Sequence, residues 1–205
     1  MGKGDQTRQA ILERAAGLAS QVGLEGLTIG RLAEELELSK SGLFAHFRSK
    51  DALQVETLRF AAELFVDRVV RPALKAPRGE PRLRALFELW SDWARATPLP
   101  GGCIFVAAAT EMDDREGPAR DELVRQQSDW LELIANVART AVREGHFRGD
   151  ADPEQFAYEL HGIMLASHHA TRLLRDPTAE GRAQRAFERL LLNFRAVPVS
   201  KKKSR

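Results

Sequence analysis

The segment from residue 28 to residue 53 constrains the fold more than any other part of this 205-residue chain. Its first apolar residues recur at helical spacing, at Ile29, Leu32, Ala33 and Leu36. The hydroxyls of Thr28 and Ser39 can each cap the N-terminus of a helix. Only Glu37 and Leu38 remain for the connection, so the second helix must cross the first steeply. This spacing predicts a helix-turn-helix unit.

The two faces of the second helix differ in chemistry. Lys40, Ser41 and Gly42 point outward, whereas Leu43 and Phe47 face inward. Small and basic side chains on the exposed face of such a unit suit a close approach to the major groove of DNA.

Cations continue past the second helix. His46, Arg48 and Lys50 follow one another closely, and Ser49 can cap a third helix that begins at Lys50. Helix N-termini and neighbouring cations bind phosphate well. The pattern therefore indicates DNA binding, although two capped helices with a short turn also occur as plain scaffold in helical proteins.

The stretch LAEELELSKSGLFAHFRSKDAL resembles the N-terminal DNA-binding domain of the tetracycline-repressor (TetR) family of bacterial transcriptional regulators. The resemblance covers about residues 7 to 55, and its specific part is the aromatic-x-His-Phe step followed by Lys and an apolar helix. It implies that residues 28–36 brace the DNA backbone and that residues 39–45 form the recognition helix. The residues it implies at the DNA, near phosphates or bases, are Thr28, Ser39, Lys40, Ser41, Gly42, Phe44, His46 and Lys50.

Two positions depart from the pattern of that family. Glu37 stands in the turn where Gly is usual, and Phe44-Ala45 replaces the usual Tyr-Tyr. A phenolic hydroxyl that commonly reaches a phosphate is thus missing. Contacts to the DNA backbone are then fewer, or are taken over by Lys40 and Arg48.

Composition indicates a globular protein of the cytoplasm. Hydrophobic residues make up 43% of the chain and charged residues 29%. The longest apolar stretch, Cys103 to Ala109, is far too short to cross a bilayer. The first residues lack the apolar core of a secretory signal, and a single cysteine cannot form an internal disulfide. We therefore expect a cytoplasmic location and no membrane partner.

Charge is distributed unevenly. The net charge is +2, but the tail from Lys201 to Arg205 carries four of the positive charges, and the rest of the chain has 27 basic and 29 acidic residues. A DNA-binding protein of this composition must concentrate its positive charge locally. The tail is expected to be a solvated, disordered end, with a phosphate-binding arm as the alternative.

The remaining sequence reads as helices separated by Pro and Gly, nine in all, with no convincing strand. We therefore predict an all-α fold in which an N-terminal three-helix DNA-binding domain precedes a larger helical domain for ligand binding and dimerisation. The predicted divisions are residues 1–50 for DNA binding, residues 51–197 for effector binding and dimerisation, and residues 198–205 for the basic tail. Later helices are expected at Lys50 to about Arg71, around residues 83–94, and at Cys103 to Met112. A long helix is then expected up to about Glu144, followed by helices from Asp152 to about Arg175 and from Ala179 to about Ala196.

Aromatic and sulfur-containing residues gather on the central helices of the larger domain. Helical bundles bury ligand cavities between facing helices, and each buried indole N–H requires a partner that a ligand can supply. A large apolar core is the alternative explanation. The predicted ligand pocket comprises Phe87, Trp90, Trp93, Cys103, Phe105, Met112, Trp130, His161, Met164 and His168. The predominance of Trp, Phe and Ala favours an apolar or aromatic effector.

The last two helices are predicted to form the dimer interface. Gly162, Ala166 and Ala170 lie at four-residue spacing and permit close helix approach. Apolar burial is expected from Leu160, Met164, Leu174, Phe187, Leu191 and Phe194. Two helices from each subunit would make an isologous four-helix bundle, and packing within one subunit is the alternative.

Catalytic and metal sites are not indicated. The chain has no G-x-S-x-G elbow, phosphate loop or dinucleotide fingerprint, and His161 and His168 are too far apart for a simple metal site. Cys103 starts an apolar helix and is interpreted as a core residue, with redox sensing as the alternative. We expect no enzyme activity, metal or cofactor.

Together these features predict a homodimeric, ligand-responsive transcriptional regulator. Its partners would be a palindromic double-stranded DNA operator and a small effector that releases it, as a repressor. The alternative function is that of a small-molecule binding protein with weak or lost DNA affinity.

Overall fold

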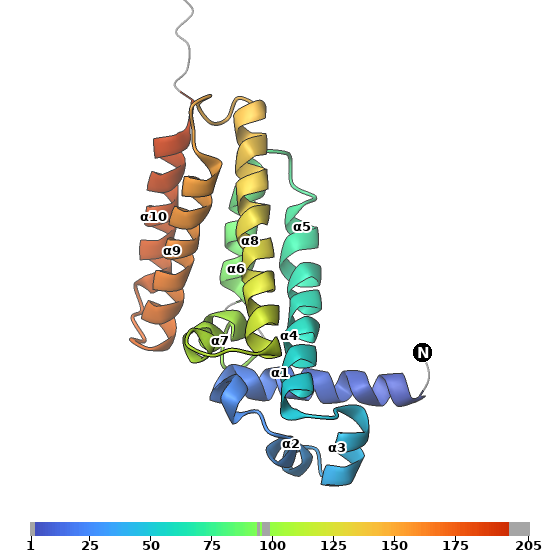
Figure 1. The fold of residues 1–205 in the computed structure, drawn as a ribbon. Coiled ribbons are helices and arrows are strands. Elements are labelled where there is room, and N and C mark those ends of the chain that lie inside the picture. The colour runs from blue at the N-terminus through green and yellow to red at the C-terminus, as the bar shows by residue number, and fades with distance from the viewer. Residues whose placement is uncertain (1–2, 94, 96–98, 197–205) are drawn as a thin grey trace, which may run out of the picture. The chain divides into compact units, whose positions relative to one another are not determined.

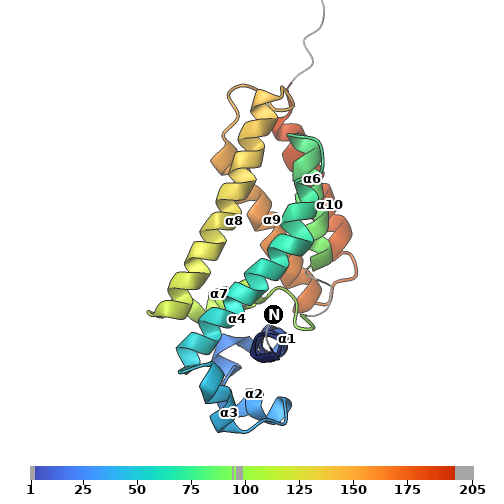
Figure 2. The ribbon, with the colours of Figure 1, turned by 90° about the vertical axis from the view of Figure 1, so that its right-hand side faces the viewer.

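The computed structural model describes residues 3–93, 95 and 99–196, and these residues form helices joined by turns (Figures 1 and 2). The elements are α1 (Lys3–Gly26), α2 (Ile29–Glu35), α3 (Lys40–His46), α4 (Lys50–Phe65), the π-helix η1 (Val66–Val70), α5 (Arg71–Ala73), α6 (Glu80–Trp93), α7 (Ile104–Met112), α8 (Pro118–Arg143), α9 (Pro153–Arg172) and α10 (Ala179–Phe194). Because α4, η1 and α5 follow one another without a break, the described residues hold nine separate helices, which confirms the predicted all-α fold. The predicted basic tail lies outside the described residues.

Two compact units make up the chain. The first combines Met1–Pro72 with Glu88–Trp130, and the second combines Ala73–Phe87 with Leu131–Arg205. The divisions between them fall inside α5, α6 and α8. The first unit therefore contains the helix-turn-helix segment together with α4, α7 and the first half of α8, and the functional division at residue 50 stays a prediction.

The three predicted helix caps are present in the first unit. Thr28 Oγ1 accepts a hydrogen bond from the backbone N–H of Arg31 at 3.1 Å, and Ser39 Oγ accepts from Gly42 at 3.1 Å. Ser49 Oγ accepts from the N–H of Ala52 at 3.0 Å. Each hydroxyl satisfies a donor that the first turn of a helix leaves unpaired, so α2, α3 and α4 begin where the sequence predicts.

The turn between α2 and α3 contains a residue in the left-handed conformation. Glu37 has a φ of 53°, and the following Leu38 N–H donates to the carbonyl oxygen of Ala33 at 2.9 Å. A side chain with a Cβ is disfavoured in this region, which glycine adopts freely. The geometry explains why glycine suits this position, and Glu37 retains the fold at a cost in backbone energy.

Small residues allow α1 to pack closely against two other elements, α4 and α7. Ala15, Ala16 and Ala19 on α1 are fully buried. In the turn before α7, the N–H of Gly101 donates to Ser20 Oγ at 2.9 Å, and a Cβ at this glycine would lie 1.6 Å from the Ser20 carbonyl oxygen. The contact is thus between backbones and excludes any other residue at position 101.

In the second unit, α9 and α10 run side by side (Figures 1 and 2). Their core includes a stacked pair, Phe87 and Phe187, with ring centroids 4.3 Å apart. At the end of this unit Arg84 Nη2 donates to Glu188 Oε2 at 2.9 Å, which ties α6 to α10. Apolar packing and a charge-assisted hydrogen bond together fix these helices.

The C-terminal end of α9 differs from the prediction. The helix ends at Arg172 rather than near Arg175. The N–H groups of Leu173 and Leu174 both donate to the carbonyl oxygen of His169, and Arg175 then adopts a left-handed φ of 51°. A helix that closes in this way cannot continue to Asp176, so the local backbone and not the following proline ends it.

The apolar residues predicted for the dimer interface also need correction. Five of the six are buried inside the subunit, with exposed fractions of 0–6%: Leu160, Met164, Phe187, Leu191 and Phe194. They pack inside the subunit and offer no surface to a partner. Leu174 is the exception, with 62% of its surface exposed. The helical stripe identified the buried face correctly but assigned it to the wrong contact.

Replacing Glu37 with glycine is expected to stabilise the protein by about 0.5–1 kcal/mol, because glycine relieves the left-handed strain and loses some of that gain to its greater freedom in the unfolded chain. Urea denaturation followed by circular dichroism measures the change. Glu34→Gly is the control: this residue lies inside α2, where glycine should instead cost about 1 kcal/mol. Equal destabilisation by both changes would contradict the strain.

Replacing Gly101 with alanine is expected to cost about 2 kcal/mol or more, since the new methyl group cannot fit beside Ser20 without moving a backbone. The same denaturation experiment applies. Gly149→Ala provides the comparison, because a Cβ there would meet no atom within 4 Å. If both variants unfold at the same urea concentration, the backbones of α1 and the turn before α7 are not in contact.

Candidate nucleic-acid interface and effector region

The predicted recognition helix α3 presents its polar and small residues to solvent. Its inner face is closed by Leu43 and Phe47, which are 0% and 1% exposed. On the outer face Phe44 is 52% exposed, although it is a large apolar residue. The remaining predicted contact residues of this face are also exposed: Ser39, Lys40, Ser41 and Gly42. The sequence therefore assigned the two faces of α3 correctly.

Thr28 and Lys40 come together at the start of α2. A Cβ placed on Gly30 would lie 3.7 Å from Lys40 Nζ and 4.0 Å from Thr28 Oγ1. A hydroxyl and an ammonium group thus flank the same exposed helix N-terminus, where backbone N–H groups also favour an anion. This grouping suits a DNA phosphate.

The other predicted phosphate contacts lie beyond α3. His46 is half-buried, with its ring centroid 6.3 Å from that of Phe47. Lys50, the first residue of α4, does not stand free: its Nζ lies 3.0 Å from Glu25 Oε2. The sequence placed Lys50 correctly at a helix start but gave no sign of this partner, which is 25 positions away.

Glu25 holds two cations at once. Its second carboxylate oxygen lies 2.8 Å from Arg115 Nη1, in the turn that follows α7. The hydrogen bond from Lys50 is the largest influence on the Glu25 carboxyl, and with the charge of Arg115 it outweighs burial, so the pKa of Glu25 is lowered. Glu25 is therefore ionised near neutral pH.

A second carboxylate, that of Glu111, fixes the backbone at this point. Glu111 Oε2 accepts a hydrogen bond from the N–H of Glu25 at 3.0 Å. Gly23, with a φ of 78°, interrupts α1 just before it, and a Cβ there would lie 1.7 Å from Glu111 Oε1. Glycine is thus needed for the backbone conformation, and a side chain there would also displace the Glu111 carboxylate.

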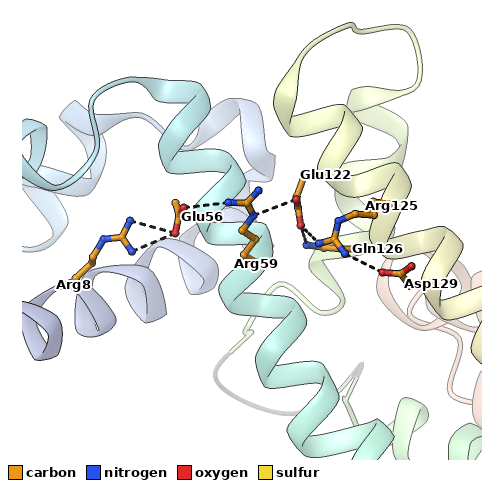
Figure 3. A network of polar contacts seen from close by, with 7 residues as sticks. All are labelled: Arg8, Glu56, Arg59, Glu122, Arg125, Gln126 and Asp129. Atoms are coloured by element: carbon orange, nitrogen blue, oxygen red, sulfur yellow. Dashed lines mark hydrogen bonds and ion pairs between the residues drawn. The ribbon is translucent and has the colours of Figure 1, made fainter. Parts of the chain in front are cut away.

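A chain of ion pairs and hydrogen bonds joins three helices of the first unit (Figure 3). Glu56 on α4 accepts from Arg8 on α1 at 3.3 Å, and it also pairs with Arg59 at 3.5 Å. Arg59 Nε in turn donates to Glu122 Oε2 on α8 at 3.2 Å. Arg125 completes the chain by contacting Glu122 and, at 3.0 Å, Asp129. The network links α1 to α8 through α4.

Glu122 is the buried member of this network, since only 6% of its side chain is exposed. Burial raises the pKa of its carboxyl, but the hydrogen bonds from Arg125, Gln126 and Arg59 together outweigh that effect and lower the pKa. An ionised carboxylate in this position needs all of these donors, because an unpaired buried charge is strongly unfavourable. Neither its burial nor its link to Arg59 follows from the sequence pattern.

Three residues of the predicted ligand pocket converge on an aromatic side chain that the prediction left out. Phe65 makes edge-to-face contacts with Trp130, Trp93 and Phe105, with ring centroids 5.0, 5.3 and 6.0 Å apart. Phe65 lies at the end of α4. Its place on the apolar stripe of that helix is the sequence feature that could have identified it as part of this aromatic group. Of the predicted set, Trp90, Cys103 and Met112 are also buried in the first unit.

One polar atom in this aromatic group is unsatisfied. The indole N–H of Trp93 is buried and makes no hydrogen bond to an oxygen or nitrogen atom of the described residues, and its contact as a donor is with the weakly accepting sulfur of Cys103. Cys103 is 2% exposed, and burial raises the pKa of its thiol despite smaller opposing effects that include Trp93. The thiol therefore stays protonated near neutral pH, which favours a core residue over a reactive cysteine.

The other four predicted pocket residues belong to the second unit: Phe87, His161, Met164 and His168. Phe87 is occupied by its stacking on Phe187, and Met164 is fully buried. Burial lowers the pKa of both His161 and His168, so each is largely neutral near pH 7. Their place in a ligand pocket stays a prediction.

In the part of the chain that the structure describes, no three His, Cys, Asp or Glu side chains lie close enough together to hold a metal ion. Nor is any helix of those residues long and apolar enough to cross a membrane.

Sequence profiles of two domain families match this chain. Residues 11–57 match the family described as "Bacterial regulatory proteins, tetR family", and residues 79–187 match "Tetracyclin repressor-like, C-terminal domain". The first match covers the helix-turn-helix segment, and the second covers about half of the chain.

Individual proteins agree with these matches. The tetracycline repressor protein class C of Escherichia coli is 46% identical over 46 residues, which are 22% of this chain and only 21% of that protein. A TetR transcriptional regulator from Chloroflexus aurantiacus is 25% identical, with a TM-score of 0.85 over 96% of this chain and 100% of that one. The fold also matches AibR, solved in complex with isovaleryl coenzyme A and operator DNA, at a TM-score of 0.67 and 22% identity over 87% of this chain and 96% of that one.

Proposed function

The chain belongs to the tetracycline-repressor family of bacterial transcriptional regulators, and on that premise we propose that it is a repressor released from a palindromic operator by a small apolar or aromatic effector. The proposal rests mainly on the exposed face of α3. This face carries small polar side chains, and cations stand at the starts of α3 and α4. Such a face serves DNA recognition and has no evident role in packing.

Base and phosphate contacts have different roles on this face. Lys40, Ser41 and Gly42 lie where a major groove would meet α3, whereas Thr28, His46 and Lys50 flank it at phosphate positions. Phe44 adds an apolar group of the kind that contacts thymine methyl groups. The missing phenolic hydroxyl is offset by the Thr28 and Lys40 pair at the start of α2.

The proposed homodimer uses the exposed stripe of α9. Tyr158, Leu165 and Leu173 are 75%, 38% and 69% exposed, and they lie on one face with Gly162 and Ala166. A Cβ at Gly162 would meet no atom within 4 Å, so the stripe has room for a partner helix. Two copies related by a two-fold axis would place two seven-residue recognition helices on the halves of a palindrome.

The effector is proposed to bind at the aromatic group around Phe65. The unpaired N–H of Trp93 supports a compound that is largely apolar or aromatic and carries one hydrogen-bond acceptor. The complex of AibR with both a small molecule and operator DNA supports a fold that can hold both partners. An effector that binds better to one spacing of the two recognition helices would shift the population toward it and lower operator affinity.

Fluorescence anisotropy on labelled DNA from the region upstream of the gene tests this function. Tight binding that exceeds binding to scrambled DNA, weakens steeply with salt and involves two subunits per site is expected. Compounds are then screened for release. Equal and weak binding to both DNAs at low salt, with small molecules still bound, would instead favour a small-molecule binding protein that has lost DNA affinity.

Lys50→Ala is expected to weaken binding to operator and random DNA by the same factor and to leave effector binding unchanged, because a phosphate contact carries no sequence information. The slope of log K against log salt should become shallower by about 0.9 for each subunit. Lys75→Ala removes the same charge from an exposed loop and serves as the control. Unchanged DNA binding in Lys50→Ala would disprove the phosphate contact.

Trp93→Phe is expected to weaken the screened effector about 2- to 12-fold, the value of one neutral hydrogen bond. Because Trp93 is buried and packs on Phe65, the smaller ring is also expected to lower urea stability, by about 1–3 kcal/mol. Isothermal titration calorimetry measures the affinity. An effector that binds Trp93→Phe as tightly as the original protein does not accept a hydrogen bond from this indole.

A further inference from the structure

Lys50 is already engaged by an internal anion. Its ammonium group lies 3.0 Å from one oxygen of Glu25, and the other oxygen of that carboxylate lies 2.8 Å from Arg115. All three side chains are partly exposed, at 40%, 36% and 52% respectively. A negatively charged ligand from solvent can therefore reach Lys50, but it must compete with Glu25.

Backbone contacts place the two groups beside each other. The N–H of Glu25 donates to Glu111, and Gly23 turns the chain so that this bond can form. Lys50 is fixed in turn as the first residue of α4, directly after the Ser49 cap. These contacts hold the two backbones, while both side chains stay partly exposed and can exchange partners.

We propose that Glu25 sets the affinity of the DNA interface, because its carboxylate competes with a DNA phosphate for Lys50 while Arg115 draws the same carboxylate away from Lys50. The inference rests on the proposed function and concerns the regulation of that same site. When DNA binds, Lys50 exchanges Glu25 for a phosphate. Glu25 keeps Arg115 as its partner, so no carboxylate is left unpaired and the exchange becomes easier.

The position of Arg115 makes this exchange adjustable. Arg115 lies in the turn between α7 and α8, and Glu111 on α7 holds the backbone beside Glu25. If α7 moves so that Arg115 is withdrawn, Glu25 keeps only Lys50 of these two cations. Glu25 then competes more strongly with a DNA phosphate for Lys50. Any ligand that moves this turn would thereby change DNA affinity without touching α3.

Glu25→Gln is the first test, measured by anisotropy on operator and random DNA across a salt series. It is expected to tighten both DNAs about two- to fivefold per subunit, the range for a partly exposed ion pair, and to leave the salt slope nearly unchanged, because Lys50 makes the same phosphate contact in both proteins. Glu34→Gln removes an exposed carboxylate from α2 and gives the effect of charge alone. Glu25→Asp keeps the charge but shortens the reach, and should also tighten binding.

Double-mutant cycles separate competition from general electrostatics. The gain from Glu25→Gln should vanish when Lys50 is alanine. Arg115→Gln should weaken DNA binding about two- to fivefold in the original protein and have no effect in the Glu25→Gln background. If charge alone were responsible, the gain in affinity from Glu25→Gln would persist in every background. Glu25→Asp would then bind DNA with the affinity of the original protein.

The outcomes distinguish the two proposals. If the original protein shows no salt-dependent DNA binding, the proposed function fails. If it binds DNA but Glu25→Gln matches Glu34→Gln, or keeps its gain without Lys50, the competition by Glu25 is overturned. Urea denaturation of each variant checks folding. If Glu25→Gln is unstable, the two single variants Glu25→Asp and Arg115→Gln decide the question. Unchanged DNA affinity in both would overturn the inference.

Discussion

The first unit depends on how closely other backbones can approach α1. Three fully buried alanines let neighbouring elements approach α1 closely, and Gly101 brings a second backbone into contact with Ser20. Contacts of this kind are stiff, because a backbone cannot change rotamer as a long side chain can. The direction of α1 is therefore set by α4 and α7, and α2 and α3, which follow α1 after a two-residue link, inherit that direction. The groups predicted to face DNA are positioned by packing that lies away from them.

Local chemistry explains which parts of the fold the sequence predicts well. A cap needs only a hydroxyl and a free N–H within about three residues, so Thr28, Ser39 and Ser49 mark the starts of their helices without any knowledge of tertiary structure. The interruption of α1 at Gly23 is equally local, since its φ of 78° is a conformation that glycine adopts freely. The inward and outward faces of α3 also follow from spacing alone. These features are decided within one helical turn, and no distant contact overrides them.

Contacts between distant segments are the part that the sequence does not give. An amphipathic stripe shows that Leu160 and Phe187 are buried, but it cannot show whether a neighbouring helix of the same chain or a second subunit covers them. In this structure the covering helix belongs to the same chain. The partners of Lys50 and Glu122 are hidden for a related reason: charged residues are common on every helix, so no spacing rule singles out the pair that meets.

The pairing of charges changes how a nearly neutral protein can bind DNA. In the first unit several cations are neutralised internally, as with Arg8 by Glu56, Arg14 by Glu35 and Lys50 by Glu25. Lys40 and Arg48, by contrast, have no ion pair within the described part of the chain. Non-specific affinity grows with each phosphate that a free cation neutralises, so this arrangement keeps it low. If the proposed base contacts on α3 are made, they account for a larger share of the discrimination, and a carboxylate that occupies one of so few cations would have a measurable effect on affinity.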